Sequence, residues 1–484
     1  MTLINKFKKL FEPIDLTKGS IYKTIIVFTI PILLSLLFQQ IYSISDAIII
    51  GQNLNHSEIS GINDAYAITF MFTEFFIGLA SGFSVLIAKK VGANDRIGAR
   101  QSLLIQMLLG LIIGIIFSII FAYLVNPLLG ALDISYENDS DKYNSAYYYT
   151  LIIASGSITM LFYNIAVGAL RSVGETLMPF LFLVFSTILN ICLDLLFIIV
   201  LKWGVVGAAV ATIASQFIAS VLAFVYLFVR YHEFRFQKED FKFSFSYILE
   251  HLKLGLPLAF QFSILGIGII VMQAGIIAFD INPTISTYPA ENGIGAAYKL
   301  SNFLMCPLIA LGTSMLSFMG QNLGAKNHQR IKDGFKASMI IGTIAFAIVF
   351  VIGLLLTING AFLYIFLNKE KITNETIKFG NDYMYVMLPF ELSLMALFVM
   401  RNSLQGVEKS LYPFLAGVAE LVARCLVCYF LPALINGGAI TSTASEASYI
   451  ALCFADPVAW LLADAVMIYP IIKHIYKNKN LTVK

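Results

Sequence analysis

The sequence predicts an all-α membrane protein with twelve transmembrane helices in two pseudo-symmetric six-helix lobes. Three observations lead to this prediction. Of the 484 residues, 58% are hydrophobic and only 13% are charged, a balance typical of chains that face lipid. Apolar runs of the ~20 residues needed to cross a bilayer recur along the whole chain. Short motifs from the first half also return in the second half.

The first half contains six such runs. The first run follows a basic N-terminal segment; it is too long for a signal peptide, and no small-residue cleavage site follows it, so it predicts a transmembrane helix. A tight turn at Lys202–Gly204 separates the fifth run from the sixth. The predicted spans cover residues 24–50, 62–88, 101–126, 146–170, 177–201 and 204–229.

The second half repeats this layout after a basic stretch that forms the predicted boundary between the lobes. Its six spans are predicted at residues 253–279, 292–319, 336–360, 380–405, 411–435 and 447–472. The predicted domains are a cytoplasmic N-terminal segment, a first lobe, a cytoplasmic linker, a second lobe and a cytoplasmic tail, at residues 1–23, 24–229, 230–252, 253–475 and 476–484.

Two motif pairs carry the internal repeat. Ala88–Asn94 ends the second apolar run, and Gly320–Lys326 ends the eighth. Arg171–Phe180 similarly corresponds to Gln405–Phe414. With six spans in each half, the two halves run in the same direction. Membrane repeats of this kind are the usual design of secondary transporters, with the substrate path between the halves.

The distribution of basic residues predicts the orientation. About 25 of the 32 Lys and Arg residues fall on one side of the predicted spans, together with both termini. The positive-inside rule then places both termini in the cytoplasm. The expected location is the plasma membrane of a bacterium, crossed many times.

Composition and missing motifs exclude several classes of protein. A net charge of +3 is too small to suggest a nucleic-acid partner. The five cysteines lie in apolar runs and predict buried small side chains, and no histidine-based metal site is expected. No phosphate-binding loop or hydrolase motif occurs, so neither an enzyme nor direct use of ATP is predicted, and no cofactor is expected.

The first half has acids inside its apolar runs, where a charged side chain is costly in free energy and therefore suggests a function. Asp46 shares a helix face with Gln39 and Ser43, and this stripe predicts a polar groove. Glu74 lies midway along the second run. The alternatives are that Asp46 reaches water at a helix end and that Glu74 only bonds to a neighbouring helix.

One further acid of the first half has a polar neighbour on its own helix. Asp194 follows Asn190 by one helical turn, so the pair could hold one proton or cation. The alternative is that Asp194 reaches water at its helix end.

The second half has the same frame but different polar residues. Glu391 is predicted in the tenth helix, Glu420 and Arg424 one turn apart in the eleventh, and Asp456 in the twelfth. Arg424 could pair with Glu420 or reach Asp456. These residues are candidates for a polar cavity, and the alternative is an ion pair that serves only packing.

Several motifs together resemble the multidrug and toxic compound extrusion (MATE) family of cation-coupled exporters. They are Gln39–Asp46, Ala88–Asn94, Gly168–Gly174 with Pro179, Leu189–Asp194, Gly204–Thr212 and Gln321–Ala325, spread over about residues 20–475. The resemblance implies two six-helix lobes around a central cavity. It also implies export of bulky, often cationic or amphipathic compounds in exchange for H⁺ or Na⁺ by alternating access.

The resemblance also implies site residues. In one branch of the family the coupling ion is bound by residues that match Asp46, Asn190, Asp194 and Thr212. Another branch uses acids on helices seven and ten; helix seven has no acid here, which leaves Glu391 as a lone candidate. The expected partners are the lipid bilayer and small organic cations, and a monomer is expected to suffice. A flippase for a lipid-linked precursor and a membrane-embedded transferase remain alternatives.

Overall fold

A computed structural model describes residues 12–130, 134–137, 139–280 and 288–477. Within these residues, twelve helical segments are long and apolar enough to cross a membrane, as predicted. The first six form the N-lobe: α2 (Ile21–Asn53), α3 (His56–Gly92), α4 (Arg96–Gly130), α5 (Ser140–Ser172), α6 (Leu177–Asp194) with the π-helical η1 (Leu195–Val200), and α7 (Gly204–Arg230).

Two short turns, η2 (His232–Phe234) and η3 (Lys238–Phe241), lead to the C-lobe. Its spans are α8 (Phe245–Ile277) with η4 (Ala278–Asp280), α9 (Pro289–Gly324), α10 (His328–Thr357) with η5 (Ile358–Gly360), α12 (Asn374–Gly406), α13 (Leu411–Asn436), and α14 (Glu446–Cys453) followed by α15 (Ala455–Ile471) and η7 (Ile472–Tyr476). The short α11 (Leu363–Phe366) and η6 (Lys369–Lys371) lie between α10 and α12.

Most helices extend beyond the apolar runs that predicted them. The second span was expected at residues 62–88, but α3 begins at His56 because Asn55 and Glu58 form a capping box at its start. Asp139 similarly caps α5 by accepting a hydrogen bond from the backbone N–H of Lys142 at 3.0 Å. Polar residues that cap and extend a helix are not part of a hydropathy signal, so the predicted bounds were too short.

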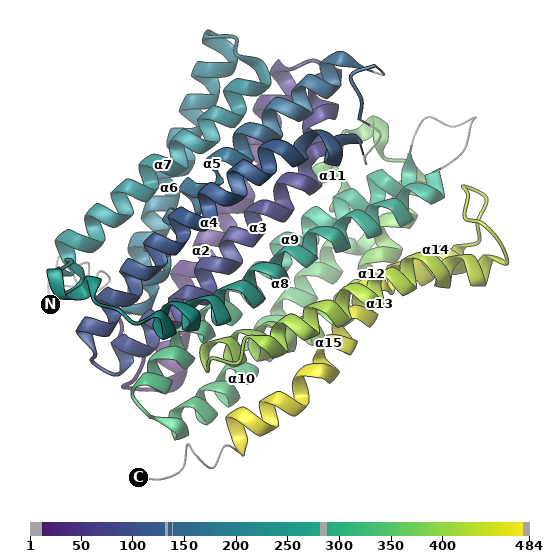
Figure 1. The fold of residues 1–484 in the computed structure, drawn as a ribbon. Helices are drawn as coiled ribbons and strands as arrows, with labels where there is room; N and C mark the ends of the chain where they lie inside the picture. The colour runs from purple at the N-terminus through teal and green to yellow at the C-terminus, as the bar shows by residue number, and fades with distance from the viewer. Residues whose placement is uncertain (1–11, 131–133, 138, 281–287, 478–484) are drawn as a thin grey trace, which may run out of the picture.

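Figure 1 shows the two lobes side by side, with both termini at the same end of the molecule. We call this end the basic side. The central helices are α3, which packs against α5 and also against α8 of the other lobe, and α9, which packs against α12 and also against α2. Each lobe therefore contributes one central helix, α3 or α9, to the contact between the lobes.

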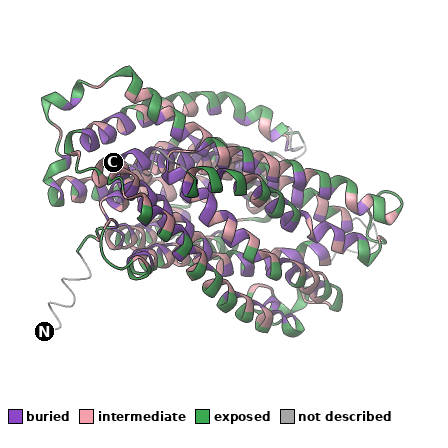
Figure 2. Ribbon diagram, turned by 90° about the horizontal axis from the view of Figure 1, so that it is seen from below, coloured by how far each residue is buried: buried purple, intermediate pink, exposed green. Residues whose placement is uncertain are grey.

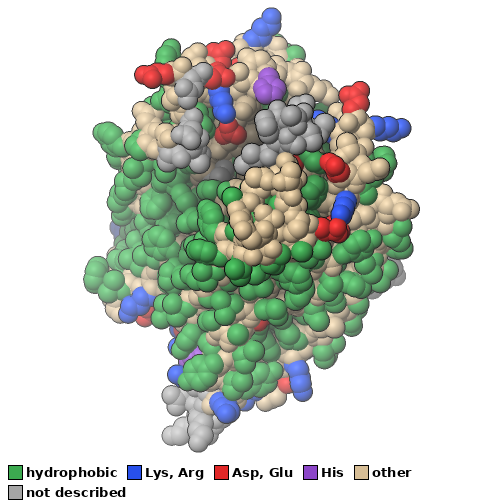
Figure 3. Space-filling view, turned by 90° about the vertical axis from the view of Figure 1, so that its right-hand side faces the viewer, with side chains coloured by type: hydrophobic (Ala, Val, Ile, Leu, Met, Phe, Trp, Pro, Cys, Tyr) green, Lys and Arg blue, Asp and Glu red, His purple; other side chains and the backbone are tan. Residues whose placement is uncertain are grey.

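The outer surface is suited to lipid. Exposed side chains lie mainly on the outward faces of the helices, and buried ones lie between them (Figure 2). On the face seen in Figure 3, hydrophobic side chains form a continuous band, and charged side chains gather mainly at its two ends. This distribution is that of a protein that spans a bilayer.

The repeated motifs meet at the basic side. Gly92 at the end of α3 lies against the backbone carbonyl of Gln321, and Gly324 at the end of α9 lies against the carbonyl of Lys89, each too close for a Cβ atom. The Lys89 ammonium donates to both carboxylate oxygens of Glu408 at 2.7 and 2.8 Å. These contacts join the two lobes where the sequence repeats.

The chain before α2 reinforces this junction. Leu16 is fully buried, and its N–H donates to Gln321 Oε1 at 3.1 Å. The Arg330 guanidinium donates to the carbonyls of Leu16, Lys18 and Gly19 at 2.6–3.0 Å. Residues 14–19 are thereby fixed to the C-lobe, and the N–H of Ile14 also bonds to Gly174 O of the N-lobe at 3.0 Å.

Candidate functional site

Three N-lobe helices converge on one polar cluster. Asp46 lies on α2, Asn190 and Asp194 on the last turn of α6, and Thr212 on α7. Directly after Asp194 the helix changes to the π-helical η1, a widening that often marks functional sites. The structure thus brings together the four residues predicted to bind a coupling ion.

Asn190 links α6 to α7 within this cluster. With its amide nitrogen turned toward Asp194, it donates to Asp194 Oδ2 at 2.9 Å and accepts from the backbone N–H of Thr212 at 3.2 Å. The Thr212 hydroxyl donates to Ala208 O at 3.1 Å and also lies within hydrogen-bond reach of Tyr42. Asp194 and Asn190 are almost completely buried, with 0% and 1% of their surface exposed.

The two carboxyl groups are the chemical centre of the cluster. Asp46 and Asp194 lie within hydrogen-bond reach of each other. One oxygen of each, Oδ1, is buried without a hydrogen-bond partner among the described residues. Two adjacent carboxylates in a low-dielectric site repel unless a proton or a cation lies between them. The arrangement can therefore take up and release a positive charge.

The same oxygens suit a hard monovalent cation. Carboxylate, amide and hydroxyl oxygens are ligands of the type preferred by alkali and alkaline-earth ions. Across the described part of the chain, no group of three or more His, Cys, Asp or Glu residues could hold a metal ion. The cluster instead offers two carboxylates, one amide and one hydroxyl, and this set of oxygens is compatible with either a proton or Na⁺.

The polar stripe on α2 only partly joins this site. Gln39 and Ser43 share the face of Asp46 but are exposed, and Ser43 donates to the Gln39 carbonyl at 3.1 Å within its own helix. Glu74 on α3 is half-buried and forms no hydrogen bond or ion pair with any described side chain. These three residues lie outside the cluster of Asp46 and Asp194.

The C-lobe contains a chain of alternating charges instead. Arg424 Nε and Nη2 both lie 2.7 Å from Asp456 Oδ1, and Nη2 lies 3.5 Å from Glu420. Glu420 in turn accepts from Arg401 at 2.6 Å. All four side chains are buried. The sequence left open whether Arg424 pairs with Glu420 or Asp456, and both contacts are present.

Glu391 lies apart from this chain. Its side chain is fully buried on α12, and both carboxylate oxygens lack a hydrogen-bond partner within the described residues. The Ser301 hydroxyl of α9 is its near neighbour. A carboxyl group without partners is costly to keep ionised at this depth, so Glu391 is a second position able to hold a proton.

Some polar residues were missed by the sequence interpretation. Arg401 was counted with the basic side, yet it is buried against Glu420. Tyr42 borders the cluster and was not singled out. Lys299 is an exposed cation within α9, and a single charge in a long apolar run gave the only signal for it.

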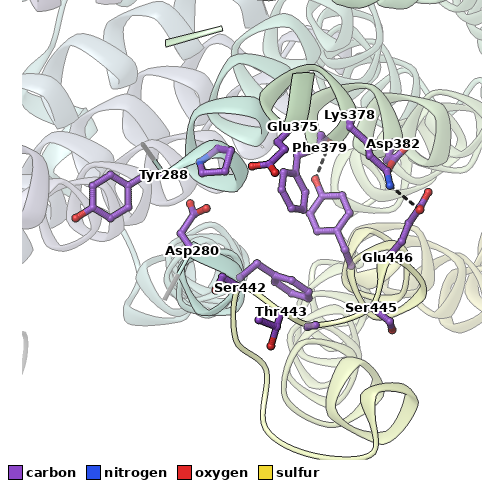
Figure 4. A pocket seen from close by; sticks show the side chains of 14 residues that line it. Asp280, Tyr288, Glu375, Lys378, Phe379, Asp382, Ser442, Thr443, Ser445 and Glu446 are labelled. Carbon is purple, nitrogen blue, oxygen red and sulfur yellow. Dashed lines mark hydrogen bonds and ion pairs between the residues drawn. The ribbon is translucent and has the colours of Figure 1, made fainter. Parts of the chain in front are cut away.

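A pocket of about 260 Å³ opens on the C-lobe at the side opposite the termini. It is lined by acids from several helices, and Figure 4 shows Lys378 of α12 pointing to Glu446 of α14, at 2.6 Å. Asp280 accepts from the N–H groups of Ala290 and Glu291 at 3.0 and 2.8 Å and so caps the start of α9. Lys378 and Glu446 thus neutralise each other, whereas Asp382 Oδ2 is buried without a hydrogen-bond partner among the described residues.

Comparison with known proteins agrees with this geometry. A family model described as MatE matches residues 31–196 and 292–430. The chain is similar to the "Probable multidrug resistance protein YpnP" of Bacillus subtilis (strain 168), with 26% identity over 320 residues, 66% of this chain and 68% of the relative. It is also similar to an "FAD transporter" of Shewanella oneidensis, with 24% identity over 334 residues, 67% of this chain and 70% of the relative.

Solved structures show the same fold. The crystal structure of MATE in complex with MaL6 superposes with a TM-score of 0.82 at 19% identity, covering 97% of this chain and 99% of that chain. Two lobes of six helices are thus the setting of the site. Since the family model covers more than half of the sequence, the chain belongs to the MATE family of multidrug efflux transporters.

Proposed function

We propose that this protein is a secondary antiporter that exports bulky cationic or amphipathic compounds in exchange for H⁺ or Na⁺. The observation that carries the proposal is the contact between the Asp46 and Asp194 carboxyl groups, each with a buried oxygen that has no partner among the described residues. Binding a proton or cation there removes the repulsion between the two acids. This change in charge favours a different packing of α2 against α6 and α7 and so couples ion entry to substrate release.

The proposed orientation has both termini in the cytoplasm. The positive-inside rule supports it, because most Lys and Arg residues lie on the basic side. The contacts around Gly92, Gly324 and Lys89 then close the cytoplasmic side. Each charge that enters through ~100 mV supplies ~2.3 kcal/mol, enough for roughly a 50-fold substrate gradient.

The test is ethidium efflux from proteoliposomes with a pH gradient and a Na⁺ gradient imposed separately. Efflux driven by one gradient and abolished in Asp46→Asn and Asp194→Asn is expected, because a neutral amide cannot release a proton or charge-balance a cation. Asp333→Asn, an exposed acid on α10, is the matched control and should transport normally. Normal gradient-driven efflux by folded Asp46→Asn would contradict the proposal, and absence of efflux in the wild type would favour a lipid-linked precursor as substrate.

A further inference from the structure

One face of the central helix α9 is left uncovered by both lobes. Most side chains of α9 are buried, but Glu291, Lys299 and Asn302 are exposed. Gly295 lies between them, and a Cβ atom added there would meet nothing within 4 Å. These positions are separated by four, four and three residues, so they form a single stripe along the helix.

The stripe lies on a helix that contacts both lobes. α9 packs against α10 and α12 of its own lobe and against α2 and α3 of the N-lobe, and it lies at the centre of the molecule (Figure 1). A helix enclosed in this way has no broad face toward lipid. We therefore expect the exposed lysine on the remaining open face to meet water, the usual surroundings of a charge inside a membrane protein.

Lys299 lies within the membrane-spanning part of α9. It follows the start of this 36-residue helix by ten residues, about 15 Å along the axis. The ring of its neighbour Tyr298 is 5.1 Å from that of Tyr383, whose hydroxyl is 3.4 Å from Asp456. Lys299 is thus level with Asp456, one end of the buried charge chain of the C-lobe.

Lys299 differs from two other cations of the membrane-spanning helices. Arg401 and Arg424 are each held by a carboxylate at 2.6–2.7 Å. No described residue forms an ion pair or hydrogen bond with the Lys299 ammonium, whereas even the peripheral Lys378 has Glu446 as its partner. The corresponding central helix of the N-lobe, α3, carries Glu74 without a partner in the described structure. The two central helices thus carry residues of opposite charge type without a partner in the described structure, Glu74 half-buried and Lys299 exposed.

We propose that Lys299 binds an anionic group, a carboxylate or phosphate, on the transported compound. This inference rests on the proposed export function and narrows its substrate class to amphoteric compounds, which carry an anionic group as well as an aromatic or cationic body. The Asn302 amide, one turn further along the stripe, can donate a second hydrogen bond to the same group. An ammonium without a protein partner is free to make such a bond, which is stronger than a bond between neutral groups.

Two dyes with one fluorophore test the proposal. Rhodamine 110 carries a free carboxylate, and rhodamine 123 is its methyl ester. Binding of both to the purified protein is measured by fluorescence polarisation without any ion gradient. In Lys299→Met, the affinity ratio of rhodamine 110 to rhodamine 123 is expected to fall about tenfold or more, the effect of losing a hydrogen bond to a charged group. Lys299→Arg should keep the wild-type ratio, as should Lys336→Met, an exposed lysine on α10.

The outcomes are separable from those of the antiport proposal. An unchanged ratio in Lys299→Met, or failure of the wild type to bind rhodamine 110, would overturn the role of Lys299 even if ethidium efflux is driven by an ion gradient. A ratio that depends on Lys299 would support it even if no gradient drives efflux, because binding is measured at equilibrium. If Lys299→Arg keeps the wild-type affinity ratio, substitution at this position does not in itself misfold the protein. The loss in Lys299→Met is then due to the missing charge.

Discussion

Four buried side chains on α12, α13 and α15 alternate in sign through the interior of the C-lobe. Each inner member, Glu420 and Arg424, has an opposite charge on both sides. Such a chain compensates the cost of removing each ion from water only while every partner is present. A single substitution that leaves one charge unpaired should therefore lower the free energy of unfolding much more than a double substitution that removes a complete ion pair.

Among the described residues, replacing Asp456 by Leu leaves the Arg424 guanidinium with Glu420 at 3.5 Å as its one remaining ion-pair partner. We expect Asp456→Leu to lower the free energy of unfolding by about 3 kcal/mol or more, as is typical for breaking a buried pair. The double variant Arg424→Leu with Asp456→Leu should recover most of this loss because no charge is left unpaired. Thermal unfolding in detergent measures both, and equal losses in the two variants would show that the pair contributes through shape alone.

Glu175, in the loop between α5 and α6, gives a pH-dependent prediction. Burial raises the pKa of its carboxyl, and hydrogen bonds from the N–H groups of Met178 and Leu177 only partly oppose this. The folded state thus holds the proton more tightly than the unfolded state. The resulting stability is complete below the ordinary pKa of about 4.5 and is lost as the pH rises through the higher native pKa.

Glu175→Gln should therefore have a higher melting temperature than the wild type at pH 8. The difference should shrink as the pH falls toward 4, where the wild-type carboxyl is protonated as well. Melting curves across this pH range provide the measurement. A constant difference at every pH would mean that the substitution acts through packing and not through charge.

At the scale of elements, the ends of α3 and α9 cross at glycines. A Cβ on Gly92 or Gly324 would overlap a backbone carbonyl of the other helix, which cannot move without separating the lobes. We expect Gly92→Ala and Gly324→Ala each to weaken the closed basic side and to reduce the yield of folded protein. Gly51→Ala on α2 is the control, since a Cβ there meets nothing within 4 Å and alanine favours a helix. Size-exclusion profiles and melting temperatures compare the three, and similar values for all would contradict this reading of the crossing.

For the molecule as a whole, the ion pair between Lys89 and Glu408 links the lobes on the basic side. Glu408→Lys places two cations together and should favour a state open on that side. Because half-exposed pairs contribute roughly 0.2–1 kcal/mol, the expected shift in population is a few-fold. The measurement is maleimide labelling of Ser172→Cys, a buried position at the junction, in a background without the five native cysteines.

The charge-swapped double variant, Lys89→Glu with Glu408→Lys, is the control for this measurement. It restores an attractive pair and should return labelling to the original rate. Labelling that stays fast in the double variant would indicate that Glu408→Lys disturbs the local fold instead of the balance between states.

Much of this molecule could be predicted from its sequence because bilayers impose simple rules. Long apolar runs predicted the twelve spans, and polar residues within those runs singled out Asp46, Asn190 and Asp194. The resemblance to a known family grouped these three with Thr212. The predicted first and last residues of the helices were less accurate, because capping residues such as Asn55 extend helices into polar sequence.

Contacts between distant segments could not be predicted in the same way. Leu16 bonds to Gln321 across 305 residues, and nothing in either local sequence indicates the partner. Arg401 was assigned to the basic side because a count of charges does not show burial against Glu420. Lys299 escaped notice because its importance depends on which face of α9 stays open, a property of packing and not of periodicity.

The crossing of Gly92 and Gly324 also bears on how such a chain could arise. The same motif from each half contacts the other half, which is the geometry of a two-fold interface between identical subunits. A single half-length ancestor could have formed that interface as a homodimer before its gene was duplicated and joined. The present halves, produced as two separate polypeptides divided between η2 and η3, should then still find each other in the membrane.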